Sequence, residues 1–172
     1  MDVIGDTVFG YKIPEKNAYR PWEIQTDMPY ALYAEGLYRA IQRMSELNKP
    51  IYITESGVPD PTDTVRTGYL IETVRALWQA VNYNFPVRGF FHWSLLDNFE
   101  WSEGFDPRYN FGLYKTNFKT QERTPRLSSH LYREICAQNG LSNDMVRRYA
   151  PELLNKLFPG EAGQNDVKLK LK

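Results

Sequence analysis

The chain has 172 residues and no formal net charge, because 21 lysine and arginine residues balance 21 aspartate and glutamate residues. This balance gives no electrostatic reason to expect nucleic acid or an anionic membrane as a partner. The single cysteine, Cys136, excludes an internal disulfide framework and fits a reducing compartment; we expect it to be a buried helix residue. No apolar run is long enough to span a membrane, and the first residues lack a secretory pattern, so we expect a cytoplasmic protein.

The first part of the chain predicts a loop, a helix and a strand, in that order. Residues 1–29 carry Gly, Pro, Asn and Asp throughout, which is typical of a long loop. A helix is expected over residues 30–47, since apolar residues recur there at spacings of three and four: Leu37, Ile41, Met44 and Leu47. Asn48 and Pro50 end this helix, and the β-rich run Ile51–Thr54 follows as a short strand.

A second helix and a second strand follow. Residues 56–64 have the composition of a turn, and Asp63 or Thr64 is expected to cap a helix over residues 65–83. The apolar run Val87–Trp93 fits a strand that is buried on both faces. Because the connections are too long for hairpins, this order predicts an α/β fold with parallel strands and right-handed crossovers.

The last part of the chain predicts mainly helices. Residues 111–118 are expected to form a short extended pair, and a helix is expected to start at Pro125 and stop at Gly140. Residues 143–157 predict one amphipathic helix. The terminal residues 167–172 alternate between apolar and basic, which is typical of a strand, but an isolated basic terminus is more often disordered.

Carboxylates and aromatic side chains gather after the two predicted strands. Glu55 follows the first strand, where α/β barrels place catalytic groups, although a lone Glu there is more often a capping or salt-bridged residue. Residues 97–106 interleave aromatic rings with carboxylates. Indole faces stack on sugar rings and carboxylates accept hydrogen bonds from hydroxyls, so this loop fits a neutral, hydroxyl-rich ligand. The alternative is an aromatic loop packed into the rim of its own fold.

Two motifs carry a family resemblance. Residues 53–57 are Ile-Thr-Glu-Ser-Gly, and residues 93–101 are Trp-Ser-Leu-Leu-Asp-Asn-Phe-Glu-Trp. In this order and separation they resemble the C-terminal part of glycoside hydrolase family one, the β-glucosidase family. The resemblance implies that residues 1–140 form roughly the last two strand–helix units of a (β/α)8 TIM barrel, incomplete as a closed barrel. It fades near residue 138, and we expect residues 141–172 to be a C-terminal tail, a helix followed by a disordered end.

The resemblance also implies a reaction and a site. Glu55 would be the nucleophile of a retaining β-glycosidase, which forms a covalent glycosyl-enzyme. Trp93 would lie under the sugar, Glu100 would accept hydrogen bonds from its 4- and 6-hydroxyls, and Trp101 would donate its indole N–H to a hydroxyl. Because a fixed carboxylate at Glu100 would repel a phosphate dianion, the expected substrates are unphosphorylated β-glucosides or oligosaccharides. Many relatives have Asn where this chain has Ser56, which alters the hydrogen bonds next to the nucleophile.

Neither a cofactor nor a metal is expected. The sequence has no Cys and His residues at the spacing of metal ligands, and we expect the two histidines, His92 and His130, to be structural.

The family's acid/base carboxylate is missing from this sequence. In the family it lies in an Asn-Glu-Pro motif, which does not occur here, and a complete barrel needs about 250 residues. We therefore expect the chain to be the C-terminal portion of a β-glucosidase, from a truncated or split gene, that works only with the missing N-terminal barrel portion. The other hypothesis is a non-catalytic carbohydrate-binding or interaction fragment. An upstream coding sequence with Asn-Glu-Pro would favour the first.

Overall fold

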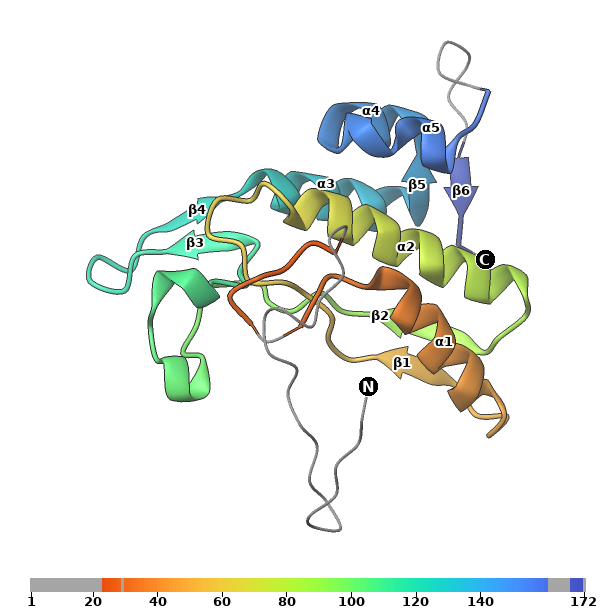
Figure 1. Cartoon of the computed structure of the whole chain (residues 1–172), viewed down its shortest axis with the longest axis horizontal. Helices are drawn as coiled ribbons and strands as arrows, with labels where there is room; N and C mark the ends of the chain where they lie inside the picture. The colour runs from red at the N-terminus through yellow and green to blue at the C-terminus, as the bar shows by residue number, and fades with distance from the viewer. Residues whose placement is uncertain (1–22, 29, 161–167, 172) are drawn as a thin grey trace.

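Two parallel strands with helices packed beside them form the centre of the molecule (Figure 1). The computed structural model describes residues 23–28, 30–160 and 168–171, so most of the predicted first loop lies outside the described residues. Helix α1 (Ala34–Ser45) precedes strand β1 (Ile51–Ile53), and helix α2 (Arg66–Asn82) connects β1 to strand β2 (Val87–Phe90). The two strands pair in parallel, which confirms the predicted order and strand direction.

The sheet formed by β1 and β2 is covered on one face only. Phe91, just after β2, is 56% exposed, and Tyr52 in β1 is 59% exposed. The prediction that Val87–Trp93 forms a strand buried on both faces is therefore wrong, and β2 is also shorter than predicted. The physical reason is that, within the described residues, this sheet has only two strands and nothing lies over its second face.

The covered face of the sheet packs against α1 and α2. Ile53 in β1 meets Ile41 from α1 and Leu77 from α2, and the two helix residues are each 2% exposed. Burial of one such side chain stabilises the fold by about 1.5–3 kcal/mol. The helical spacing correctly predicted that Ile41 is buried. Met44 and Leu47, the last two residues with that spacing, are 50% and 61% exposed.

The start of α2 is capped by a residue that the sequence did not single out. Asp60 accepts hydrogen bonds from the main-chain N–H groups of Val65 and Arg66, at 2.8 and 3.0 Å, so the prediction of Asp63 or Thr64 as the cap is wrong. Asp63 instead pairs with the buried guanidinium of Arg66 and accepts a hydrogen bond of 2.7 Å from the N–H of Ser128. This carboxylate thereby joins the start of α2 to the start of the helix that contains Ser128.

After the second strand the chain forms a hairpin and a helix. Strands β3 (Tyr114–Thr116) and β4 (Arg123–Pro125) are antiparallel, so only part of the predicted pair over residues 111–118 is strand. Helix α3 (Leu127–Gln138) follows. It ends at Asn139, which adopts the left-handed conformation with φ 47°, rather than at the predicted Gly140. Asn tolerates this conformation because its short amide can bond locally.

Apolar side chains of residues 140–160 pack against α2 and α3. Strand β5 (Gly140–Ser142), helix α4 (Asn143–Tyr149) and helix α5 (Leu154–Leu157) follow one another, separated by a 3₁₀ turn at Pro151–Leu153. A single helix over residues 143–157 is therefore wrong, because proline lacks the N–H that a continuous helix needs.

The expectation that the C-terminal end is disordered is wrong for residues 168–170, which form a strand. Strand β6 (Lys168–Lys170) pairs antiparallel with β5, as the alternating pattern favoured. Leu141 and Met145 share a core with Leu131 of α3 and with α2. The division between residues 1–140 and 141–172 stays a prediction. Cys136, on α3, is exposed rather than buried.

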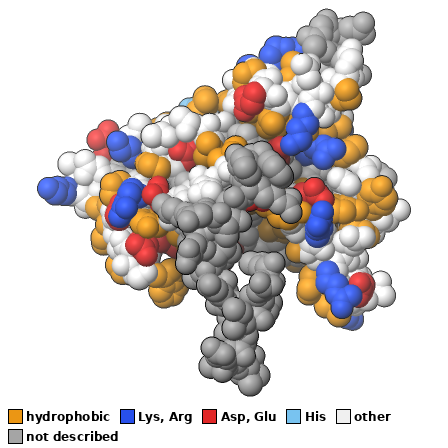
Figure 2. Space-filling model, viewed as in Figure 1, with side chains coloured by type: hydrophobic (Ala, Val, Ile, Leu, Met, Phe, Trp, Pro, Cys, Tyr) orange, Lys and Arg blue, Asp and Glu red, His pale blue; other side chains and the backbone are white. Residues whose placement is uncertain are grey.

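Hydrophobic side chains reach the surface at several places, including the end of α2. Figure 2 shows them gathered where α2 ends and β2 begins, and Tyr83 in this region is 64% exposed. Within the described part of the chain, none of the helices has both the length and the apolar character needed to cross a membrane.

Candidate active site

The two parallel strands bring the residues that follow them together at one edge of the sheet. The main-chain N–H of Trp93 donates a hydrogen bond of 3.0 Å to the carbonyl of Ser56, the residue after Glu55. A Cβ atom at Gly57 would lie only 1.7 Å from the carbonyl oxygen of Trp93, so only glycine allows this approach. The segments that carry Glu55 and Trp93 are therefore in direct main-chain contact. The peptide bond between Trp93 and Ser94 is cis.

Glu100 and Trp101 lie on the loop after β2. The N–H of Glu103 donates to the carbonyl of Glu100 at 2.8 Å, which closes a 3₁₀ turn over Trp101–Glu103, and the N–H of Glu100 donates to the carbonyl of Gly104, also at 2.8 Å. Partial burial first, and then the negative charges of Glu55 and Glu103, raise the pKa of the Glu100 carboxyl. The structure thus places Glu55 and Glu100 close enough to interact electrostatically. Trp101 is 82% exposed, compared with 37% for Trp93.

A buried ion pair fixes this loop to the rest of the fold. The two terminal guanidinium nitrogens of Arg126 donate to the carboxylate of Asp97, at 2.8 and 2.9 Å, and the side chains of Arg126 and Asp97 are 7% and 0% exposed. The same carboxylate accepts hydrogen bonds from the N–H groups of Gly112 and Thr116, at 2.9 and 3.2 Å. Such a satisfied network holds the start of the loop rigidly.

The structure divides the carboxylates of the loop into two groups. Asp97 is buried in its ion pair, and Asp106 accepts from the N–H of Arg108 and pairs with its guanidinium. Glu100 and Glu103 are not committed in this way to an ion pair within the described residues. These two remain the candidates for hydroxyl binding.

The aromatic residues of the loop divide similarly. The rings of Phe99 and Phe105 lie 5.4 Å apart, and those of Phe105 and Phe118 lie 4.5 Å apart. These three rings pack against one another, as expected if the aromatic residues of the loop serve to pack the loop against the fold rather than to bind a ligand. The open indole of Trp101 does not belong to that cluster, so its face remains available to a ligand.

Two tyrosines beside the site were missed by the sequence reasoning. The hydroxyl of Tyr69, in the first turn of α2, lies 3.2 Å from the hydroxyl of Ser56. Partial burial, followed by the neighbouring Tyr69 hydroxyl and Glu100 carboxylate, raises the pKa of Tyr30 to about 12. Tyr69 therefore contacts the residue after Glu55, and Tyr30 lies close enough to Tyr69 and Glu100 to interact electrostatically. Their sequence signal is weak, because a Tyr on a helix or in a loop has many ordinary packing roles.

His92 lies beside Tyr132 of α3 and within electrostatic range of Arg66 of α2. Neither of its ring nitrogens has a hydrogen-bond partner within the described residues, and its ring lies 5.9 Å from that of Tyr132. Burial first, and then the positive charge of Arg66, lower the pKa of His92 from 6.5 to about 4. The side chain is therefore neutral at pH 7 and acts as a packing residue, in keeping with the structural role expected from the sequence.

Acid should destabilise the chain through His92. Because its pKa is lower in the folded state than in the unfolded state, its contribution to stability is complete above about pH 6.5 and is lost as the pH falls towards 4. The expected loss is roughly 3 kcal/mol. Urea unfolding at pH 7 and pH 4, compared with a His92→Leu variant, measures this contribution. An equal loss of stability in the variant would show that carboxylates alone cause the effect.

No metal site is formed by the described residues. Within residues 23–28, 30–160 and 168–171, no group of three or more His, Cys, Asp or Glu side chains is arranged to hold a metal ion.

Comparison with known proteins identifies the family. The family model described as "Glycosyl hydrolase family 1" matches residues 10–141, which include Glu55, Trp93, Glu100 and Trp101. The chain belongs to glycosyl hydrolase family 1. It is 41% identical over 118 residues to a β-galactosidase of Pyrococcus woesei, covering 68% of this chain and 23% of that protein. It is 33% identical over 130 residues to β-glucosidase A of Thermotoga maritima, covering 69% of this chain and 29% of that protein.

The structural comparison agrees with this membership. The chain superposes on the crystal structure of a β-glucosidase from Pyrococcus furiosus with a TM-score of 0.70 and 32% identity. The match covers 77% of this chain and 28% of that structure. The chain thus spans about a quarter of the length of its family 1 relatives, and its fold corresponds to an open part of their TIM barrel.

Proposed function

We propose that this chain supplies the nucleophile and part of the sugar site of a retaining β-glycosidase acting on unphosphorylated β-glucosides. The observation that carries the proposal is the main-chain junction between the segments of Glu55 and Trp93 at the ends of two parallel strands. This junction joins the main-chain segments of the proposed nucleophile and the proposed sugar platform, and covalent catalysis on a sugar requires that such groups be held in fixed positions. The remaining strands of the barrel, with the acid/base carboxyl, come from residues other than these 172.

In this reaction Glu55 attacks the anomeric carbon, and the bond from that carbon to the leaving oxygen breaks. The second carboxyl, about 5–5.5 Å away in a retaining site, gives its proton to the leaving oxygen. The same group then removes a proton from water, which attacks the glycosyl-enzyme and releases the sugar and the free Glu55 carboxylate. Ser56, held by Tyr69, adds a fixed hydroxyl next to the nucleophile.

Three side chains of the chain are proposed to bind the sugar. Trp93 provides the apolar surface for the sugar ring, and Glu100 accepts hydrogen bonds from its hydroxyls. The nearby charges of Glu55 and Glu103 that raise the pKa of Glu100 also make the site unfavourable for a phosphate dianion. Trp101 is exposed and provides an indole N–H for a further hydroxyl.

The 172-residue chain by itself is expected to leave aryl β-glucosides unhydrolysed. Its sequence contains no Asn-Glu-Pro motif, and a general acid/base group contributes typically about 10²–10⁴-fold to such a rate. A nitrophenyl β-glucoside assay with pure protein checks this, with Glu55→Gln as the control for contaminating enzyme. Robust turnover that disappears in Glu55→Gln would mean that the chain carries an acid/base group of its own.

A further inference from the structure

The junction between α3 and β5 contains the single Asn-Gly pair of the sequence, Asn139–Gly140. The fold constrains both residues. Asn139 ends α3 in the left-handed conformation, with φ 47° and ψ 50°, which few residues other than Gly and Asn adopt readily. Gly140 begins β5, and a Cβ atom there would collide with the carbonyl oxygen of Leu169 in β6. The close pairing of β5 with β6 therefore requires Gly at this position.

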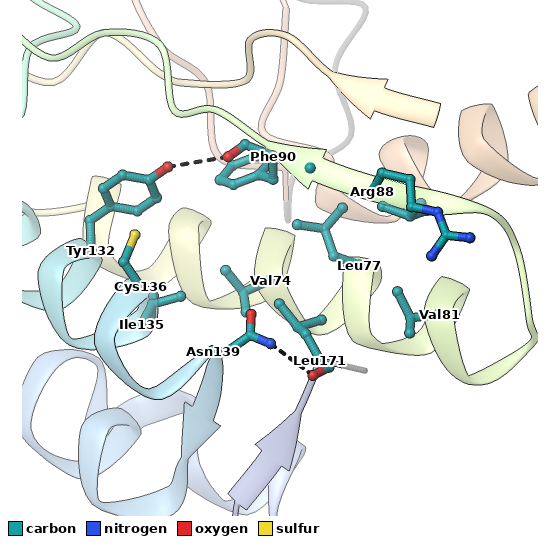
Figure 3. Close-up of a pocket in the computed structure, with 12 residues that line it drawn as sticks. Val74, Leu77, Val81, Arg88, Phe90, Tyr132, Ile135, Cys136, Asn139 and Leu171 are labelled. Carbon is teal, nitrogen blue, oxygen red and sulfur yellow. Dashed lines mark hydrogen bonds between the residues drawn. The ribbon is translucent and has the colours of Figure 1, made fainter. Parts of the chain in front are cut away.

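Strand β6 and the residue after it hold the Asn139 side chain in place (Figure 3). Nδ2 of Asn139 donates to the carbonyl of Leu171 at 3.0 Å, and the N–H of Leu171 donates to the carbonyl of Asn139 at 2.9 Å. Leu171 in turn lines an apolar groove beside β2, together with Leu77 and Val87. The two hydrogen bonds to Asn139 thus hold Leu171 against the core formed by α1, α2 and β1.

An Asn-Gly pair is chemically labile because Gly has no side chain to hinder an attack by its own nitrogen. The main-chain nitrogen of Gly140 attacks Cγ of Asn139 and loses its proton, and the bond from Cγ to Nδ2 breaks to release ammonia. The product is a cyclic succinimide. Water then opens this ring, either at Cγ to give aspartate or at the main-chain carbonyl to give isoaspartate. Overall, one water is consumed and one ammonia is released, with no oxidation or reduction.

The folded conformation prevents this attack. With ψ at 50°, the nitrogen of Gly140 lies on the opposite side of the Cα–C bond from Cβ of Asn139, so it cannot reach Cγ. The hydrogen bond from Nδ2 to Leu171 also fixes the side-chain amide. Ring closure requires rotation about the Cα–C bond of Asn139, and this rotation moves Gly140 out of its close contact with Leu169. The reactive state is therefore one in which β6 has detached from β5.

We propose that Asn139–Gly140 is a deamidation site that is protected while β6 is paired and reacts when β6 detaches. Strand β6 has only three residues, and within the described part of the chain it pairs with β5 alone. Short segments with few partners open locally at a low cost in free energy. Asn139 is exposed, so water for the hydrolysis reaches it.

The product does not restore the original contacts. The aspartate formed from Asn139 has no N–H to donate, and its carboxylate faces the carbonyl of Leu171, which is also an acceptor. Isoaspartate adds one carbon to the main chain between α3 and β5, which shifts β5 relative to β6. Deamidation thus makes the detachment of β6 permanent and uncovers the groove that Leu171 helps to line.

The first test follows the folded 172-residue chain at neutral pH by peptide mass spectrometry. The peptide that contains Asn139–Gly140 is expected to gain the mass that accompanies conversion of an amide to an acid, with isoaspartate in the product. In the chain denatured with guanidinium this reaction is expected to be about tenfold faster or more, because nothing then holds β6. Equal rates in the folded and the denatured chain would overturn the proposal that β6 protects the pair.

Two variants of β6 test the strand itself. Leu169→Gln removes the apolar contact of β6 with the core and is expected to raise the rate of deamidation in the folded chain by about tenfold. Lys170→Gln introduces the same residue at the next position, where the side chain is exposed, and is expected to leave the rate nearly unchanged. Circular dichroism checks that both variants are folded. Equal rates in two folded variants would contradict the proposal.

Variants of Asn139 test the consequence without depending on the fold of a β6 variant. In Asn139→Asp the amide of Leu171 is expected to exchange its hydrogen about tenfold faster than in the unchanged chain, as measured by NMR. Asn139→Gly keeps the left-handed end of α3 and has no side-chain amide, so its peptide is expected to gain no mass. A mass gain in Asn139→Gly would assign the reaction to another residue. Unchanged exchange at Leu171 in Asn139→Asp would show that the modification does not release β6.

Discussion

Replacing Glu55 with Gln in the completed enzyme is expected to abolish the glycosyl-enzyme and to lower kcat by on the order of 10⁴-fold or more. An amide cannot attack the anomeric carbon, so the covalent intermediate does not form. Steady-state kinetics with a nitrophenyl β-glucoside measure the loss. Addition of azide to Glu55→Ala should restore turnover and give a product of inverted configuration, because the small anion enters the space of the missing carboxylate.

Glu100→Gln is the matched control for this loss. Glu100 lies on the loop after β2 and is proposed to bind hydroxyls, so its amide variant should keep the retaining mechanism while discriminating less among sugars. If Glu100→Gln loses the glycosyl-enzyme and Glu55→Gln keeps it, the two roles are exchanged.

Replacing Asp97 with Ala is expected to destabilise the chain by about 3–5 kcal/mol, because it leaves the buried Arg126 guanidinium without its partner. The N–H groups of Gly112 and Thr116 also lose their acceptor. The free energy of unfolding, from urea titration at pH 7, measures this effect. The ion pair between Asp106 and Arg108, which lies at the surface and has an N···O distance of 2.7 Å, provides the control.

Asp106→Ala should cost no more than about 1 kcal/mol, because exposed pairs contribute little to stability. Equal costs for Asp97→Ala and Asp106→Ala would mean that the buried pair does not anchor the loop. The result matters for function as well, since Asp97 fixes the start of the loop that carries Glu100 and Trp101.

The order of elements and the position of Glu55 were predictable because they depend on local signals. Helical spacing placed the buried Ile41, and Gly and Pro residues marked the turns between elements. The motif around Glu55 showed that it follows a strand, and the structure places it after β1. Parallel pairing then followed from connection length.

The features that could not be predicted depend on contacts between distant residues. Asp60 rather than Asp63 caps α2, because Asp63 is drawn into contacts with Arg66 and with Ser128 at the start of α3. The β5–β6 pair joins segments far apart in the sequence, so a short basic run predicts a strand only when its partner is known. The contact between Tyr69 and Ser56 likewise joins a helix to a loop and leaves no periodic signal.

The burial of β2 could not be predicted for a different reason. An apolar run indicates a strand that is covered on both faces in a complete barrel, but the residues that would cover Phe91 do not lie in the described part of this chain. The apolar run Val87–Trp93 therefore predicts the burial of this strand in a complete barrel, and not its burial in this chain. The exposed face and the groove beside β2 are the consequence.

The most direct test of the account is to trap the glycosyl-enzyme. The chain, completed by the remaining barrel portion, is treated with a 2-deoxy-2-fluoro-glucoside bearing a good leaving group, which slows hydrolysis of the covalent intermediate. Peptide mapping by mass spectrometry then locates the label. We predict that the sugar is attached to Glu55, within the peptide that contains residues 53–57. A label on the peptide that contains Glu100, with Glu55 unmodified, would contradict the account.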